Sequence, residues 1–235
     1  MDGAELDGGH GEDLLGKLRE RKKARTRRAL VVEALESFAL YGADAVTLDD
    51  LCLQVGVSKR TFFRYFTSKE DVAMKPLQDL WLEFLRRLES EPLSRNADVT
   101  VLSVLHDTLV VSIRECADRD SDWIHLVRLA LGLDAVHTSF AAHNLRFCDE
   151  AVRAALGVLA PGLGISVSDD PRLRLLLGMF LVATRDAQRT WILRTDDNEG
   201  AESLILLVDH TVAALSASLG LKAPRLRACL RSETD

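Results

Sequence analysis

The sequence predicts an all-α protein of about nine helices. Apolar residues recur at i, i+3 and i+4 over most of the chain, as one buried helix face requires. β-Branched and polar residues alternate over no useful length, so strands are not expected. Clusters of Pro, Gly, Asp and Glu interrupt the pattern at residues 91–92, 161–164, 169–171 and 196–200, where helices are expected to end.

The length and composition fit a globular protein of one large domain or two smaller ones. The chain has 235 residues, of which 47% are hydrophobic, and its formal net charge is −6. Residues 1–16 are acidic and glycine-rich, so a disordered acidic tail is expected there. Residues 17–75 carry 13 Lys and Arg against 8 Asp and Glu, so this region is basic within an acidic chain. We expect one domain over residues 17–75 and a second over residues 76–235.

Several classes of protein are not expected. The N-terminus lacks the apolar core of a signal peptide, and no apolar run reaches the ~18–20 residues that span a bilayer. A cytoplasmic protein with no membrane partner is therefore expected. The cysteines form no CxxC pair and the histidines are scattered, so no metal or other cofactor is expected. The chain shows no nucleophile–base motif and no phosphate-binding glycine loop after a strand, which argues against an enzyme.

The basic region begins with a charged stretch over residues 17–28. A helix with its apolar face on Leu30, Ala34 and Phe38 follows, and Gly42 suits its left-handed C-terminal position. This helix is the first of three expected in the N-terminal domain.

Two short helices joined by a glycine-containing turn follow. Thr47 opens the first with a T-x-x-D capping pattern, and Ser58 caps the second after the turn at Gly56. Ser68 opens a further helix with S-x-x-D. Two short helices around such a turn form a helix-turn-helix, whose packed core would leave the outer face of the second helix exposed.

That exposed face has the chemistry of a surface for double-stranded DNA. Arginine can hold guanine with two hydrogen bonds, and threonine can contact thymine. The start of the next helix and the basic stretch can hold phosphates or reach a minor groove. The same charges could be solvated, and the tyrosine could serve packing as well as phosphate contact. The candidate DNA-binding residues are Thr47, Ser58, Lys59, Arg60, Thr61, Arg64, Tyr65, Lys69, Arg25 and Arg28.

Residues 38–72, FALYGADAVTLDDLCLQVGVSKRTFFRYFTSKEDV, closely resemble the DNA-binding domain of TetR-family regulators. The shared features are the Phe-Ala-x-x-Gly helix end, the Gly-Val-Ser turn, the aromatic recognition helix and the Ser-Lys-Glu-Asp opening. The resemblance covers about residues 22–75. One departure is Phe63, which stands where the family usually has a phosphate-contacting tyrosine.

The resemblance implies a C-terminal domain that dimerises and senses a small molecule. Its helices are expected near residues 77–90, 98–117, 122–134, 137–159, 171–194 and 201–219. A pocket needs an apolar lining with a few polar anchors, and the composition favours a lipophilic effector. The same side chains could instead be ordinary core residues. The candidate ligand-binding residues are Trp123, Phe147, Phe180, Thr184, Gln188 and Arg185.

The last helix is apolar on more than one face, so it must be buried on several sides. The resemblance implies that the last two helices pair with a second copy of the chain. Reading two half-sites one helical turn apart also requires a two-fold dimer. The candidate interface residues are Leu204, Leu207, Val208, Thr211, Val212 and Leu215.

The resemblance therefore implies a sequence-specific transcriptional regulator, expected to be a repressor that a small lipophilic ligand releases from its operator. One alternative is a ligand-independent helix-turn-helix or architectural protein, whose DNA binding no metabolite would alter. Another alternative is an activator.

Overall fold

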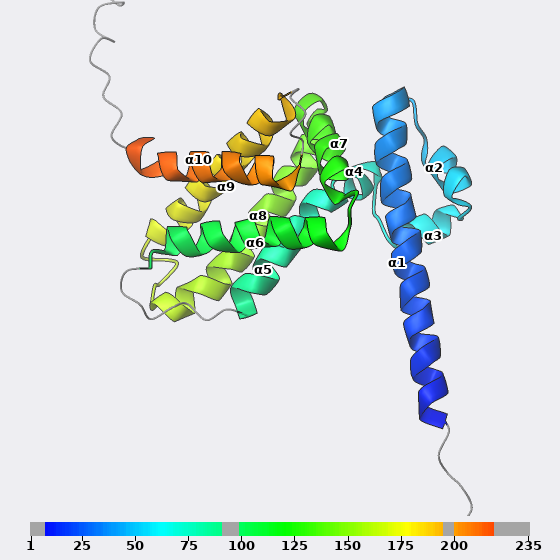
Figure 1. Ribbon diagram of the computed structural model, residues 1–235, viewed down its shortest axis with the longest axis horizontal. Coiled ribbons are helices and arrows are strands. Elements are labelled where there is room, and N and C mark those ends of the chain that lie inside the picture. The colour runs from blue at the N-terminus through cyan, green and yellow to red at the C-terminus, as the bar shows by residue number, and fades with distance from the viewer. Residues whose placement is uncertain (1–7, 91–98, 195–199, 219–235) are drawn as a thin grey trace, which may run out of the picture. The chain divides into compact units, whose positions relative to one another are not determined.

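The structure, a computed structural model, describes residues 8–90, 99–194 and 200–218 (Figure 1). These residues form ten helices and no strand, which confirms the all-α fold class. The helices are α1 (Gly8–Tyr41), α2 (Leu48–Val55), α3 (Lys59–Phe63), α4 (Lys69–Ala73), α5 (Lys75–Ser90), α6 (Val101–Arg119), α7 (Trp123–Val136), α8 (Thr138–Leu163), α9 (Arg172–Ile192) and α10 (Ala201–Ser218).

The helices divide into two compact units. Unit 1 runs to Asp79 and includes Asp122–Phe147, whereas unit 2 contains Leu80–Ser121 and the chain from Cys148 onward. Helices α5 and α8 each contribute residues to both units. The domain boundary expected between residues 75 and 76 stays a prediction.

Helix α1 begins at Gly8, within residues 1–16 where a disordered tail is expected. The part of that segment before Gly8 lies outside the described residues. Leucine, glutamate, lysine and arginine are common between residues 12 and 28, and all four favour helix. Because these residues continue a helix that is packed further along, the extension bears no separate cost of nucleation.

The packed half of α1 carries the core of unit 1. Leu30, Leu35 and Phe38 are fully or almost fully buried on one face of the helix. The ring of Phe38 meets Phe140 of α8 edge-on, with the ring centroids 6.0 Å apart. Phe62 of α3 is fully buried as well. Burial of Phe62 fixes the rotation of α3 and leaves the opposite face of this short helix exposed.

Two helix ends differ from the sequence prediction. The helix that opens at Ser68 is expected to run to about residue 77, where the next is expected to begin, but α4 ends at Ala73 and α5 begins at Lys75. Pro76 lacks the N–H that would continue the hydrogen bonds of α4, and proline is tolerated in the first turn of a helix such as α5. Helix α8 is expected to stop near residue 159 but continues through Pro161 to Leu163. Its left-handed end is Gly164, which has a φ of 64°.

In unit 2, α10 packs against α9 and α6. The Trp191 indole N–H donates a 2.8 Å hydrogen bond to the Ser203 hydroxyl, which joins α9 to α10. The Arg114 Nε of α6 donates to the Glu202 Oε1 of α10 at 2.8 Å. These contacts fix α10 along one side of unit 2.

None of the helices that the structure describes has the length and apolar character needed to cross a membrane.

Candidate functional site

The helix-turn-helix of unit 1 is held by its predicted caps. The Thr47 hydroxyl accepts from the Asp50 N–H at 3.2 Å, and the Thr47 N–H donates to the Asp50 carboxylate at 2.8 Å. Gly56 adopts a φ of 69°, which lets the Val57 N–H reach the Cys52 carbonyl at 2.9 Å. The Ser58 hydroxyl accepts from the Thr61 N–H at 3.2 Å and so starts α3. The hydroxyls of Thr47 and Ser58 therefore orient the two helices.

The outer face of α3 displays two arginines of different character. Arg60 is exposed and has no hydrogen bond or ion pair with any residue that the structure describes. Arg64 is exposed too, but its guanidinium donates to the Tyr65 hydroxyl at 3.1 Å and lies 5.0 Å from the centre of the Tyr65 ring. Thr61 is half-buried beside them. The predicted residues of α3 thus come together on one surface, with Arg60 available to a ligand.

Lys59 is held at the edge of this surface by an acid that sequence reasoning missed. Its ammonium lies 2.8 Å from the Asp49 carboxylate of α2, and both side chains are largely exposed. The hydrogen bond with Asp49, followed by the charge of that carboxylate, raises the pKa of Lys59. Such an exposed pair stabilises the fold little, so Lys59 can exchange Asp49 for a phosphate. An Asp one helix away from a Lys gives no local pattern by which to find this pair.

Lys69 is used inside unit 1. Its ammonium donates to the carbonyl oxygens of Ala43 and Val46, at 2.5 and 2.8 Å. It also lies 5.6 Å from the centre of the Phe38 ring. The structure therefore shows Lys69 fastening the loop between α1 and α2.

The two α1 candidates have different surroundings. The Arg28 guanidinium donates to the Asp122 carboxylate at 2.7 Å, immediately before α7. Arg25 is exposed, and no ion pair joins it to another described residue. Arg28 is thus held by an ion pair within unit 1, whereas the side chain of Arg25 stands in solvent.

Unit 2 contains an apolar cavity with a free volume of about 10 Å³, which is room for about one water molecule. Helices α5, α8 and α9 line it with aromatic and aliphatic side chains and one cysteine. The rings of Phe84 and Phe180 stack at a centroid distance of 6.1 Å, and Trp81 meets Phe84 edge-on at 5.5 Å. The lining residues are Trp81, Phe84, Cys148, Ala151, Val152, Ala155, Leu177, Phe180 and Leu181.

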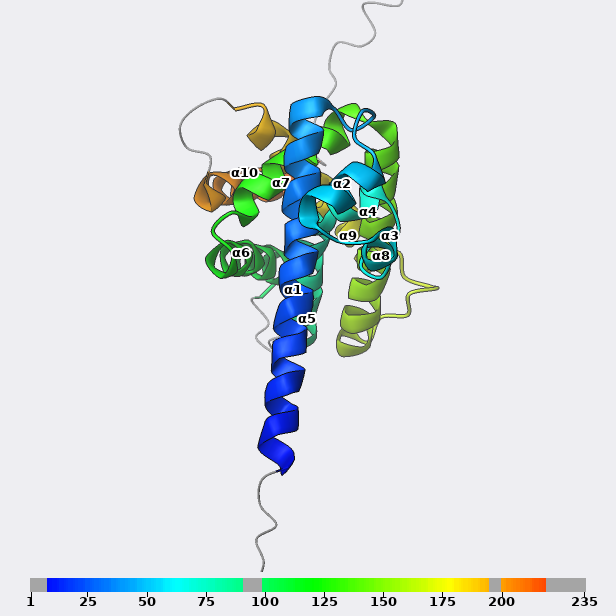
Figure 2. The same cartoon turned by 90° about the vertical axis from the view of Figure 1, so that its right-hand side faces the viewer.

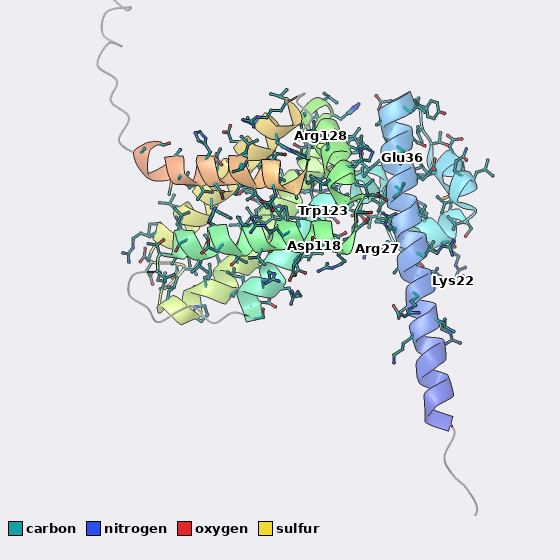
Figure 3. All side chains as sticks on the ribbon, viewed as in Figure 1. Lys22, Arg27, Glu36, Asp118, Trp123 and Arg128 are labelled. Atoms are coloured by element: carbon teal, nitrogen blue, oxygen red, sulfur yellow. The ribbon has the colours of Figure 1, made fainter. Side chains whose placement is uncertain are left out.

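Of the six candidate ligand-binding residues, Phe180 lines this cavity and the other five do not. Trp123 of α7 belongs to unit 1, where its buried indole N–H donates to the Pro76 carbonyl at 3.2 Å (Figure 3). The Thr184 hydroxyl donates to the Phe180 carbonyl at 3.0 Å, one turn back in the same helix. Gln188 is buried, whereas Arg185 and Phe147 are half-buried. Sequence reasoning named no residue of α5, and on α8 it named Phe147 and missed the lining residues, whose apolar side chains look like ordinary core.

Four of the six candidate interface residues are buried within the single chain. Leu204, Leu207, Val208 and Val212 are at most 7% exposed, while Thr211 and Leu215 are half-buried. Helix α10 turns these residues toward its own unit, because α9 and α6 pack against it. The large apolar residues that are exposed on the last two helices are therefore not among the six candidates.

Three large apolar side chains of α9 and α10 remain in solvent. Leu175 and Val182 of α9 are 59% and 67% exposed, and Leu206 of α10 is 62% exposed. Leu175 and Val182 stand seven residues apart and so share one face of α9.

Comparison with known proteins gives two consistent results. The family model described as bacterial regulatory proteins, tetR family, matches residues 30–73. Over 188 residues the chain is 31% identical to the HTH-type transcriptional regulator TcmR of Streptomyces glaucescens, which covers 80% of this chain and 82% of that protein.

Among solved structures, the fatty acid degradation regulator FadR from Bacillus halodurans has a similar fold. The TM-score is 0.52 at 18% sequence identity, and the match covers 84% of this chain and 97% of that chain. At this identity the likeness concerns the fold.

Proposed function

Because this chain belongs to the tetR family of bacterial regulatory proteins and is a transcriptional regulator, we propose that it binds a specific operator through α3. Regulators of this family bind operator DNA, dimerise and bind small-molecule effectors, and they are not enzymes. We propose further that this protein is a cytoplasmic repressor, and that an apolar effector bound in unit 2 releases it from DNA.

Arg60 carries the DNA-binding part of the proposal. Its guanidinium stands exposed on α3 and is unpaired among the described residues. The neighbouring Thr61 and Arg64 add a hydroxyl and a second guanidinium to the same surface. An arginine in the major groove reads guanine through O6 and N7, and losing such a contact costs about 1–3 kcal/mol. Lys59 and Tyr65 stand beside this surface and are assigned to phosphates, whereas Lys69 is left out because backbone carbonyls occupy its ammonium.

The test is the affinity of the full chain for the DNA upstream of its own gene, measured by fluorescence anisotropy at several salt concentrations. Arg60→Ala should weaken binding to that DNA roughly 5- to 150-fold and leave binding to random DNA unchanged. Arg153→Ala, which removes an exposed arginine of α8, is the matched control and should behave as wild type. Equal affinity of wild type and Arg60→Ala for both DNAs would refute the assignment.

The effector proposal is supported by the cavity lining. Every lining residue is apolar or a cysteine, so a bound molecule would find few polar partners and would gain affinity from burial of its own apolar surface. The cavity has about 10 Å³ of free volume, so an effector must displace side chains such as those of Phe84 and Phe180. That displacement supplies the difference between two conformations that release from DNA requires.

Apolar aromatic compounds should therefore lower the operator affinity, and small polar or ionic compounds should not. A panel of both kinds, titrated into the protein–operator complex and followed by anisotropy, tests this. An operator affinity that no compound changes would favour the ligand-independent alternative. A reporter gene that loses expression when the regulator is deleted would identify an activator.

For the dimer we propose a surface different from the one that periodicity suggests. The exposed apolar side chains Leu175, Val182 and Leu206 lie on α9 and α10, the two helices that we expect to pair with a second copy of the chain. Leu204 and Val208 are already buried against the chain's own helices, so they support the interface from behind.

A further inference from the structure

The N-terminal part of α1 is a charged helix that stands in solvent over most of its length. Every residue from 16 to 25 is exposed, and Leu30 is the first buried residue after them. Figures 1 and 2 both show this part of α1 extending past α2 and α3 within unit 1. Lys22 projects from the extension, as Figure 3 shows. We call residues 17–28 the basic arm.

The basic arm concentrates positive charge. It contains eight Lys and Arg and one acid, Glu20, in a chain whose formal net charge is −6. Attraction between charges acts over about 8–10 Å at physiological salt, so the arm can bind an anionic surface although the whole protein is acidic. The Lys23 ammonium lies 2.6 Å from the Glu20 carboxylate, but both groups are exposed and the pair is weak.

Two contacts divide the arm into faces that point in different directions. The guanidinium of Arg27 lies 5.7 Å from the centre of the Phe66 ring, which follows α3 in the chain. Lys23 and Arg19 stand four and eight residues before Arg27, so they share its face. We call these three residues the α3-side stripe.

The other face points toward α7. Arg28 pairs with Asp122 just before α7, at 2.7 Å. Arg25 and Arg21 stand three and seven residues before Arg28, so they lie on its side of the helix. The α3-side stripe and this α7-side face thus both carry basic side chains. The first lies toward α3 and the second toward α7.

We propose that the α3-side stripe binds the sugar-phosphate backbone of DNA next to the half-site that α3 reads. The inference rests on the proposed function, because it needs α3 in the major groove. The arm and the packed part of α1 are one helix, so the position of α3 also sets the position of the stripe. From Arg19 to Arg27 the helix rises about 12 Å, comparable to four base pairs at about 3.4 Å each. The complementary charge and this continuity point to backbone phosphates as the partner.

The stripe binds DNA outside the half-site that α3 reads, so its contribution to affinity depends on the length of the DNA. Each neutralised phosphate contributes about 0.9 to the slope of log affinity against log salt. Binding by the stripe therefore predicts a steeper slope on an operator duplex with flanking base pairs than on the same operator trimmed to its two half-sites.

The experiment measures full-length protein on both duplexes at several salt concentrations. Arg19→Gln/Lys23→Gln removes two charges from the α3-side stripe, and Arg21→Gln/Arg25→Gln removes two from the α7-side face. Glutamine retains helix propensity, so both variants should keep α1 helical, which circular dichroism checks. Arg27 is left unchanged because it contacts Phe66.

Arg19→Gln/Lys23→Gln should reduce the slope on the long duplex by about 2 and lower affinity there several-fold. It should match wild type on the trimmed duplex, and Arg21→Gln/Arg25→Gln should match wild type on both. Equal losses for the two variants, or no loss for either, would overturn the proposal. If Arg60→Ala still weakens specific binding in those cases, the proposed function stands without the arm. If wild type itself fails to bind the operator, both proposals fall.

Discussion

The Lys69 ammonium donates a 2.8 Å hydrogen bond to the backbone carbonyl of Val46, so a lysine at the start of α4 secures the loop that precedes α2. A second bond to the Ala43 carbonyl completes the attachment. The position of a cation at a helix start suggests phosphate binding, and the contacts assign it a role in stability. The two roles predict different outcomes for the same variant.

Lys69→Met should destabilise the protein by about 1–3 kcal/mol, because it leaves two backbone carbonyls without a charged donor. The slope of log affinity for DNA against log salt should remain that of wild type. Urea unfolding and salt-dependent anisotropy measure the two quantities. Arg146→Met, at an exposed position of α8, controls for loss of a surface cation. A slope reduced by about 1 with unchanged stability would show that Lys69 binds a phosphate instead.

Ser203→Ala should lower the free energy of unfolding by about 1–3 kcal/mol, because the buried indole N–H of Trp191 loses its acceptor. Ser218→Ala, at an exposed position of the same helix, should change stability by much less. Both are measured by urea unfolding. Equal stabilities of the two variants would mean that a water or a rearranged neighbour replaces the Ser203 hydroxyl.

The features predicted best from the sequence are those with local causes. The caps at Thr47, Ser58 and Ser68 and the turn at Gly56 follow from side chains and glycines that act on their own neighbours. Helix periodicity also predicts the number and order of the later helices, and it places their ends within a few residues of the observed ones. The start of α1 at Gly8, the break at Met74 and the passage of α8 through Pro161 required the structure.

The functions of buried and paired residues could not be predicted in the same way. Periodicity marks Val208 as apolar, but it does not say whether α9 or a second copy of the chain covers it. In the same way it cannot show that Trp123 belongs to unit 1 and Phe180 to the cavity in unit 2. These are long-range relationships, which depend on how distant helices meet.

The pairing of α6 with α10 should depend on pH. His106 Nε2 lies 2.7 Å from the Asp209 carboxylate and His106 Nδ1 lies 2.9 Å from that of Asp107. Burial acts to lower the pKa of His106, but the hydrogen bonds and charges of the two carboxylates together raise it above 6.5. His210 follows Asp209 in α10, and Arg114 of α6 pairs with Glu202 of α10 further along the same two helices.

A raised folded-state pKa means that His106 contributes stability below pH 6.5, and that the contribution is lost as pH rises through the folded-state value. Because both carboxylates are partly exposed, the contribution should be at most about 1 kcal/mol. Urea unfolding of wild type and His106→Gln from pH 5.5 to 8.5 would measure it, at roughly one-unit intervals. A stability difference that stays constant over this range would contradict the prediction.

Val182→Glu and Leu206→Glu should each weaken self-association, because a carboxylate in an apolar interface must be desolvated without a partner. The dimer dissociation constant should rise by at least about 30-fold, equivalent to about 2 kcal/mol. Sedimentation velocity over a range of concentrations measures it. Leu53→Glu, on exposed α2 of unit 1, is the matched control. Unchanged dimers of both α9 and α10 variants would place the interface elsewhere.

Filling the cavity of unit 2 and enlarging it should have opposite effects on the binding of apolar ligands. Ala155 lines the cavity from α8 and is 2% exposed, so Ala155→Leu should fill the free space at a cost of about 1–3 kcal/mol from overpacking. Phe180→Ala removes half of the aromatic stack with Phe84 and should cost about 3–5 kcal/mol, while opening a larger apolar space. Both substitutions lie in unit 2 and leave the residues of α3 unchanged.

Ala155→Leu should therefore bind the operator as wild type does but no longer respond to an apolar effector found in the titration panel. Phe180→Ala should bind small apolar probes such as benzene more tightly than wild type, seen as a probe-dependent rise in unfolding temperature. Ala141→Leu, a half-exposed alanine in the unit 1 part of α8, controls for the added side chain. Release of Ala155→Leu from DNA at the wild-type effector concentration would exclude the cavity as the effector site, since the added leucine occupies the space that the effector needs.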